Sequence, residues 1–224
     1  MENSYEATMK YLVERFSFDE AGALPIKVDA DRFRGLTSMF KDLGFKKGVE
    51  VGVNNGRYSK WIMIKAKPDK LYLVDPYKEY ASYVESHYNG QDVFDQYYEN
   101  AKTRLKQWTD QARTEFIRKE SMSAVEDFVD NSLDFVFIDG NHTFEYVVND
   151  IAEWEKKIKP GGIISGHDYW RSFDSRKPLY VKTLTPKDKL KLIQVKDAVD
   201  GWTRANQIKP WFVTKDRCWF YVKQ

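Results

Sequence analysis

The sequence has few of the features that mark membrane proteins, disulfide-rich scaffolds or nucleic-acid binders. Its 224 residues include one cysteine, Cys218, so no internal disulfide can form, which fits a reducing compartment. No apolar run approaches the roughly 20 residues that span a bilayer. The formal net charge is only +2, which does not favour a nucleic-acid partner. The first residues mix charged and apolar side chains, unlike a signal peptide. We therefore expect a cytoplasmic protein that binds neither membranes nor nucleic acids.

Short apolar runs alternate with amphipathic stretches along most of the chain. Residues 5–16 and 33–43 have apolar side chains at helical spacing, and a connector with Gly and Pro separates them. The last apolar runs, "WFVT" and "CWFYVK", predict an antiparallel hairpin. Between residue 43 and this hairpin, helices are predicted over 57–66, 93–108, 123–129, 144–157 and 195–206. Strands are predicted over 47–53, 70–76, 114–120, 133–140 and 161–168.

This alternation predicts an α/β fold. Strands joined through helices imply right-handed crossovers and a mainly parallel sheet that is covered on both faces. In such sheets ligands bind at the carboxyl ends of the strands. We expect one α/β domain over 46–224, and a helical extension over 1–45 that caps the same core.

The first two strand ends carry residues typical of a nucleotide site. The first ends in "EVGVNNG", a glycine-containing turn before a helix, although a dinucleotide fingerprint would have glycine at Asn54. Asp75 ends the second strand, about twenty residues later, which is the spacing of an acid that binds a ribose diol. Either feature alone also fits an ordinary turn. Together they predict a nucleoside-containing cofactor.

Two further aspartates end the fourth and fifth strands. Asp139 and Asp168 are expected at neighbouring strand ends, where two carboxylates can share one cation. His142 follows Asp139 by three residues, and His167 directly precedes Asp168. The chain has only three histidines. Plain alternatives are a turn at Asp139, a cap at Asp168 and a backbone hydrogen bond from His142. Carboxylates favour Mg²⁺, whereas a histidine ligand shifts the preference toward Mn²⁺, Fe²⁺ or Zn²⁺.

Five stretches carry a family resemblance. "VEVGVNNG", "LYLVDPY", "RKESMSAVEDF", "LDFVFIDGNHTFEYVVNDIAEWEKKIKPGGIISGHDY" and the closing hairpin resemble class I S-adenosylmethionine-dependent methyltransferases. The subgroup contains bacterial small-molecule and sugar O-methyltransferases. The resemblance implies a Rossmann-like, doubly wound sheet of seven strands in the order 3-2-1-4-5-7-6, with strand 7 antiparallel. "DPY" also resembles a motif of DNA-adenine methyltransferases, but it has one proline and ends the second strand instead of the fourth.

The resemblance also implies roles for individual residues. Asp139, His167 and Asp168 would hold a divalent cation, Mg²⁺ or Mn²⁺, although metal-dependent members usually have a carboxylate at the position of His167. His142 would act as the base, with Asp139 beside it in the catalytic site. The implied contacts with S-adenosylmethionine are Glu50 and Gly52 at the methionine end, Asn54 and Gly56 in the loop, Asp75 at the ribose, Ser121 and Met122 at the adenine, and Asp139.

The sequence therefore predicts an S-adenosylmethionine-dependent, metal-assisted O-methyltransferase. The expected acceptor is a small hydroxylated molecule or a glycan unit, flanked by the aromatic stretches 75–100 and 169–184. One alternative is a metal-independent methyltransferase that uses His142 as its base. Another is a non-catalytic binding subunit that keeps the fold. The sequence leaves a homo-oligomer open.

Overall fold

The computed structural model describes residues 4–19, 21–79, 90–172 and 192–224. Most of the predicted helices and strands are present within these ranges. The helices are α1 (Tyr5–Phe16), the π-helical turn η1 (Arg32–Leu36), α2 (Thr37–Asp42), α3 (Arg57–Lys65), α4 (Gln91–Thr109), α5 (Ser121–Ala124), the 3₁₀ turn η2 (Val125–Asp127), α6 (Phe144–Lys157) and α9 (Val195–Ala205). The strands are β1 (Ile26–Val28), β2 (Lys47–Val51), β3 (Lys70–Val74), β4 (Thr114–Ile117), β5 (Leu133–Ile138), β6 (Ile158–Gly166), β7 (Phe212–Thr214) and β8 (Trp219–Val222).

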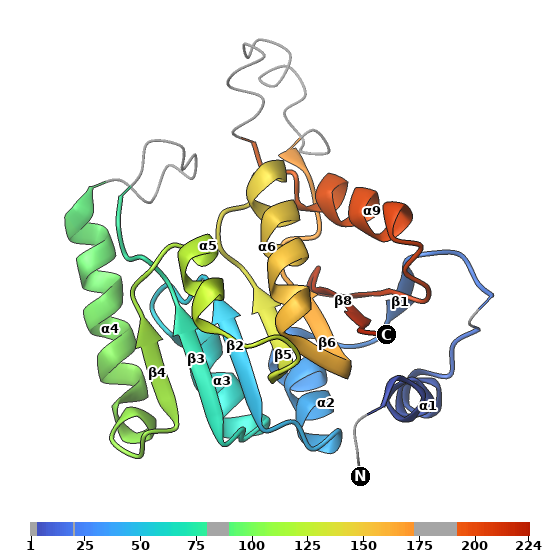
Figure 1. The fold of residues 1–224 in the computed structure, drawn as a ribbon, viewed down its shortest axis with the longest axis horizontal. Coiled ribbons are helices and arrows are strands. Elements are labelled where there is room, and N and C mark those ends of the chain that lie inside the picture. Colours follow the sequence, from blue (N-terminus) through green and yellow to red (C-terminus); the bar gives the residue numbers. More distant parts are fainter. Residues whose placement is uncertain (1–3, 20, 80–89, 173–191) are drawn as a thin grey trace.

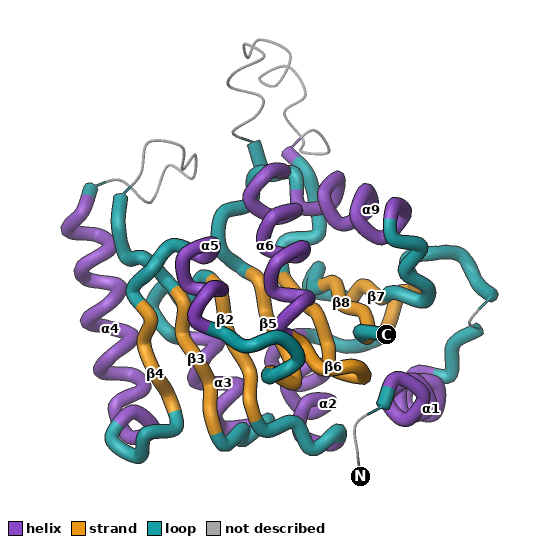
Figure 2. The backbone as a smooth tube through the Cα atoms, viewed as in Figure 1, coloured by secondary structure: helices purple, strands orange, loops and turns teal. Residues whose placement is uncertain are grey.

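The strands form one sheet in the order β1-β7-β8-β6-β5-β2-β3-β4. From β4 to β7 this is the order 3-2-1-4-5-7-6 that the sequence predicts, so the fold class is confirmed. Strand β8 runs antiparallel to both β6 and β7, and the remaining pairs are parallel. The helices lie on both sides of this sheet, as Figure 1 and Figure 2 show.

An eighth strand, β1, extends the predicted sheet at one edge. Ile26 pairs with Phe212 in the parallel β1–β7 ladder, although residues 19–29 were expected to form a connector. The strand has three residues and follows Pro25, so its pattern is too short to stand out from a Gly- and Pro-containing stretch. Because β1 anchors the N-terminal segment to the sheet, the residues that follow it lie near the strand ends.

The central strand β5 explains how the sheet divides the core. All six of its residues are buried, and alternate side chains point to opposite faces. Phe135 and Phe137 belong to the core beneath α1, α2, α3 and α4, whereas Val136 and Ile138 belong to the core beneath α5, α6 and α9. In Figure 1, α5 and α6 lie in front of the sheet and α3 lies behind it. Burial on both faces fixes the register of the strand, and therefore the position of Asp139 just beyond its end.

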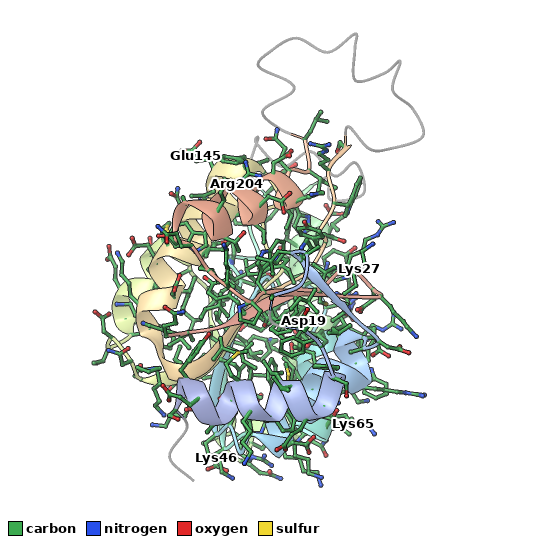
Figure 3. The ribbon with its side chains drawn as sticks, turned by 90° about the vertical axis from the view of Figure 1, so that its right-hand side faces the viewer. Asp19, Lys27, Lys46, Lys65, Glu145 and Arg204 are labelled. Carbon is green, nitrogen blue, oxygen red and sulfur yellow. The ribbon has the colours of Figure 1, made fainter. Side chains whose placement is uncertain are left out.

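Charged side chains lie around the outside of this core. In Figure 3, Lys46 and Lys65 lie toward the end of the molecule where α1 crosses, and Glu145 and Arg204 lie toward the opposite end, near α9. None of the helices within the described ranges is long and apolar enough to cross a bilayer.

Candidate active site

A cavity of about 440 Å³ opens at the carboxyl ends of the central strands. Its size is in the usual range for small-molecule sites, roughly 300–1,000 Å³. Asp75, Ser121 and Asp150 line one part of it, and Asp139 and His142 line another. Because β3, β2, β5 and β6 are neighbours, one continuous space joins the end of β3 to the ends of β5 and β6. Most of the predicted site residues therefore line a single cavity.

The turn between β2 and α3 is built around Gly52. This residue has φ 88°, and a Cβ atom there would lie 2.1 Å from the carbonyl oxygen of Asp139. Only glycine fits both the positive φ and this close approach. Asn54 also has a positive φ of 51°, which asparagine tolerates better than most residues. The turn therefore packs directly on the backbone that carries Asp139.

Asp75 holds this turn from the neighbouring strand. Its carboxylate accepts hydrogen bonds from the backbone N–H groups of Asn54, at 2.9 Å, and Tyr77, at 2.8 Å. The Tyr77 hydroxyl donates to the backbone oxygen of Asn54 at 2.8 Å. Burial raises the pKa of Asp75, and the backbone hydrogen bonds oppose that rise. Backbone N–H groups thus fix Asp75, which lines the cavity beside them.

Glu50 is the most deeply buried carboxyl group that lines the cavity. It is 2% exposed and accepts a hydrogen bond from the Ser59 hydroxyl. Burial raises the pKa of Glu50 to about 8; the Ser59 hydrogen bond opposes this rise, and the negative charge of Asp139 adds to it. In the empty protein at neutral pH, Glu50 is therefore mostly protonated.

Ser121 and Asp150 form a polar pair at the β4 end of the cavity. The Ser121 hydroxyl donates to Asp150 and accepts a hydrogen bond from the Trp154 indole at 2.8 Å. Burial raises the pKa of Asp150 to about 7. Met122 is half-buried on α5 and does not line the cavity. The sequence analysis missed Asp150, although it is a charged residue on the apolar face of a predicted helix.

The β5–α6 loop, "DGNHT", presents two functional groups. The backbone N–H of Asp139 donates to the Val51 oxygen at 2.7 Å, which continues the ladder past the end of β5. The Asn141 side chain accepts from the backbone of Thr143 at 3.0 Å, an Asx turn that leads into α6. The backbone oxygen of His142 accepts from Gln194, just before α9. An ordinary turn therefore presents Asp139 and His142 to the cavity.

The end of β6 presents His167 and Asp168. Asp168 has φ 52°, an uncommon conformation for a residue other than glycine, and one that occurs often at functional sites. His167 Nε2 lies 2.9 Å from the backbone oxygen of Asp216. Because a carbonyl oxygen only accepts hydrogen bonds, Nε2 carries the hydrogen. The other nitrogen, Nδ1, faces the two aspartates.

Two aspartates and two histidines meet at these loop ends. His142 Nε2 is 3.2 Å from Asp139 Oδ1 and 3.6 Å from Asp168 Oδ2. His167 Nδ1 is 3.1 Å from Asp168 Oδ1 and 3.7 Å from Asp139 Oδ1. Asp139, His142 and Asp168 each offer a donor atom within 4.8 Å of the others. We call these three residues the acidic cluster. The sequence analysis predicts His167 as the ligand with the two aspartates, and the structure brings His142 equally close.

The charges of this group stabilise one another. Burial alone would raise the pKa values of Asp139 and Asp168, but hydrogen bonds and positive charge from the histidines hold both below their usual value. Burial would lower the pKa of His167, yet its hydrogen bonds to both aspartates raise it to about 9. His167 is therefore an imidazolium at neutral pH when no cation is bound to the aspartates.

Arg32 enters the site from the N-terminal segment and was not predicted. Its Nη1 atom lies 3.2 Å from Asp139 Oδ2, and its Nε atom lies 3.8 Å from Asp216 Oδ2. The backbone N–H of Arg32 also donates to Asp216, at 3.1 Å. No periodicity or motif links residue 32 to residue 139. The contact follows from the pairing of β1 with β7.

Cys218 is fully buried, as expected for a structural thiol. Burial raises its pKa well above the usual value, so it stays protonated at neutral pH. It lies with His167 and Asp216 in a second group of donor atoms within 4.8 Å of one another. The aromatic stretches expected to flank the acceptor lie partly outside the described residues, at 80–89 and 173–191.

Tyr58 has a polar atom that the protein leaves unpaired. The residue is 6% exposed and lines the cavity, and its hydroxyl forms no hydrogen bond within the described part of the chain. A buried unpaired hydroxyl is destabilising, so we expect Tyr58→Phe to raise the free energy of unfolding of the empty protein by about 1 kcal/mol. In a thermal melt this corresponds to about 2–4 °C. Tyr72→Phe, at a half-buried ring, should change little, and a lower melting temperature for Tyr58→Phe would show that the hydroxyl does have a partner.

The comparisons with known proteins agree with this geometry. Residues 49–169 match the model of a family described as a methyltransferase domain. A putative caffeoyl-CoA O-methyltransferase from Staphylococcus aureus superposes with a TM-score of 0.61 at 12% identity, over 99% of this chain and 92% of that one. An O-methyltransferase from Bacillus cereus, solved with SAH, gives 0.57 at 11% identity, over 100% and 92%. Cofactor-bound Rv0187 from MTB gives 0.59 at 12% identity, over 97% and 88%.

At these identities the superpositions show the shared fold alone. No curated protein sequence matches the chain. The family match, in contrast, covers more than half of the chain, and it runs from within β2 to just past Asp168. It therefore includes the turn at Gly52, Asp75 and the acidic cluster. The chain belongs to the methyltransferase domain family, and it is a class I S-adenosylmethionine-dependent methyltransferase.

Proposed function

We propose that this enzyme transfers the methyl group of S-adenosylmethionine to a hydroxyl oxygen of a small acceptor, either a hydroxylated small molecule or a sugar unit. One observation carries the proposal. A single cavity joins Asp75, the expected ribose ligand, to the acidic cluster with its imidazole base. The cofactor and an acceptor hydroxyl can therefore be held in one space. The solved structures described as O-methyltransferases share this fold, which supports the same reaction class.

The cofactor would lie along the carboxyl ends of β3 and β2. Asp75 lines the cavity at the end of β3, where its carboxylate can accept hydrogen bonds from the ribose hydroxyls in addition to those from the backbone. Glu50 lies beside the Gly52 turn, where a carboxylate would pair with the methionine ammonium. Ser121 and Asp150 offer polar atoms at the adenine end. The cofactor supplies a sulfonium methyl group that is already activated, so the remaining tasks of the protein are alignment and deprotonation.

His142 is the proposed base. Its Nε2 atom faces Asp139 and Asp168, so a hydrogen on Nε2 is shared with the carboxylates, and in that tautomer Nδ1 is the nitrogen that can accept a proton. The carboxylates orient the ring and stabilise the imidazolium that forms. Histidine is the side chain that most often serves as a general base at neutral pH.

The residues of the acidic cluster also fit a divalent cation. Ligand atoms that share one ion lie within about 5 Å of one another, since each bond measures about 2.0–2.6 Å, and these three residues meet that condition. The His167 Nε2–H is held by a backbone carbonyl, the usual outer partner of a ligating imidazole. Oxygen and nitrogen donors together favour Mn²⁺ as well as Mg²⁺. A bound cation would lower the pKa of the acceptor hydroxyl and fix its direction.

The two roles of His142 exclude each other at Nε2. If Nε2 ligates a cation, the atom carries no hydrogen toward Asp139, and the ring acts as a ligand. If no cation binds, the same atom donates to Asp139, and the ring acts as a base. A metal-assisted and a metal-independent reaction therefore predict different responses to a chelator.

An acceptor screen tests the proposal. The protein is incubated with S-adenosylmethionine and a panel of catechols, caffeate, free monosaccharides and glycosides, and SAH formation is measured with EDTA, with Mg²⁺ and with Mn²⁺. Methylation of an oxygen that EDTA suppresses and added cation restores supports the metal-assisted reaction. Full turnover in EDTA selects the metal-independent reaction. SAH binding with no turnover on any acceptor, in the presence of either cation, would contradict the catalytic proposal and favour a binding subunit.

SAH binding is expected to release a proton from Glu50. With a pKa of about 8, this carboxyl is mostly protonated in the empty protein at pH 7. The methionine ammonium favours the carboxylate, so binding releases about 0.9 proton at pH 7, and SAH affinity rises with pH until it levels off above pH 8. Calorimetry in two buffers with different ionisation enthalpies measures this release. Glu50→Gln should abolish it, and so should methylthioadenosine, which lacks the amino group. A heat of binding that does not depend on the buffer would contradict the assignment.

A further inference from the structure

The guanidinium of Arg32 contacts one member of the acidic cluster, Asp139, from the N-terminal segment. It bonds Asp139 through Oδ2, whereas both histidines approach Oδ1 of the same carboxylate. One face of Asp139 therefore meets a fixed positive charge, and the other face meets the space where a cation would bind. The two positive charges would share a single carboxylate.

The surroundings of Arg32 keep the guanidinium in this position. It lies 5.0 Å from the ring centre of Phe33 and 5.7 Å from that of Tyr58, both within cation–π range. Its side chain is 22% exposed. Asp216 accepts the backbone N–H of Arg32 and lies 3.8 Å from its Nε atom, which has no hydrogen-bond partner within the described residues. β1 anchors the preceding residues to the sheet. Arg32 is thus held by two aromatic rings, by its backbone and by charge.

The positive charge of Arg32 is permanent, because a guanidinium stays charged in proteins. It lies 3.2 Å from Asp139 and 3.8 Å from Asp216. A divalent cation bound between Asp139 and Asp168 would therefore meet a repulsion from Arg32 that no change of protonation removes.

We propose that Arg32 is a resident counter-ion of the acidic cluster, which positions Asp139 in the metal-free enzyme and weakens the binding of a divalent cation there. This inference rests on the cation site of the proposed function. It makes the N-terminal segment the part of the chain that sets the cation affinity. It also makes Arg32 a positioning residue, which acts through Asp139.

Binding of Mn²⁺ alone, followed by the loss of the free-ion signal in electron paramagnetic resonance, tests this inference. Arg32→Gln removes the charge and keeps much of the side-chain length, so it should bind Mn²⁺ at least tenfold more tightly than the wild type. Arg32→Lys keeps the charge and should stay near the wild type. Arg57→Gln is the matched control, because Arg57 also lies over Phe33 and lines the cavity but forms no ion pair with the cluster within the described residues. It should change the affinity by less than twofold.

The possible outcomes separate this inference from the cation site itself. If Asp139→Asn loses Mn²⁺ binding but Arg32→Gln binds no more tightly than the wild type, the site stands and the role of Arg32 is overturned. Equal tightening in Arg32→Lys and Arg32→Gln also overturns it, since charge is then not the cause. If no variant binds Mn²⁺ while all still bind SAH, both the cation site and the inference fall. If Arg32→Gln does not fold, Arg32→Met keeps the stem packed on Phe33 and Tyr58, and the same result is expected of it.

Discussion

Methyl transfer by a His142→Ala variant is expected to fall by roughly two to four orders of magnitude, the usual loss when a general base is removed. His142 is 11% exposed and lies within 3.6 Å of both aspartates of the acidic cluster, so the variant removes the proposed base from the cluster. SAH affinity should stay within about threefold, because the ring faces the acceptor side of the cavity. The rate is measured as SAH formation on an acceptor that the screen yields.

The pH profile of the variant separates the two roles of His142. If the imidazole is the base, the wild-type rate falls on the acid side, and the variant loses this dependence. If it is a ligand, the variant also binds Mn²⁺ more weakly. A variant that keeps its rate, its pH profile and its Mn²⁺ affinity would remove His142 from the site.

Asp75→Ala is expected to weaken SAH binding by at least about a hundredfold, because two ribose hydroxyls lose a charged acceptor and each such bond contributes about 1.5–3 kcal/mol. The Asn54 and Tyr77 backbone groups also lose their partner, so the turn itself becomes less ordered. Calorimetry with SAH and with methylthioadenosine measures the effect. Both ligands carry the ribose, so both should bind more weakly.

Asp69→Ala is the matched control for Asp75, since it removes an exposed carboxylate just before the same strand. It should leave the affinity unchanged. Asp75→Ala with wild-type affinity for both ligands would place the ribose elsewhere. Weaker binding of SAH alone would instead assign Asp75 to the methionine end.

The sequence predicted the sheet well because its strands are long enough to carry a pattern. β5 is a run of six buried residues between turn signals, and the helix after it has apolar residues at positions that meet one face. β1 has only three residues, and its partner β7 lies almost two hundred residues further along the chain. Its stability comes from that partner, so no local signal marks it.

The same distinction applies to the candidate site. Asp75, Asp139 and Asp168 follow the ends of β3, β5 and β6, which run parallel in one sheet, so the topology brings them to one edge. Arg32 bonds a residue 107 positions away through a segment whose path depends on β1, so the sequence gives no indication of the contact. Asp150 differs from the strand-end aspartates and from Arg32, because its own helix carries a signal. Its place among Val147, Ile151 and Trp154 on the buried face of α6 marks a polar side chain that needs a partner, and that signal could have been used.

A crystal structure of the enzyme with SAH and Mn²⁺ tests the central claim most directly. The account predicts ribose hydroxyls within hydrogen-bond distance of Asp75, the SAH sulfur facing the acidic cluster, and anomalous density for Mn²⁺ between Asp139 and Asp168. The ion should lie on the Oδ1 side of Asp139, away from Arg32. SAH bound with its sulfur turned away from His142, or its ribose away from Asp75, would contradict the account.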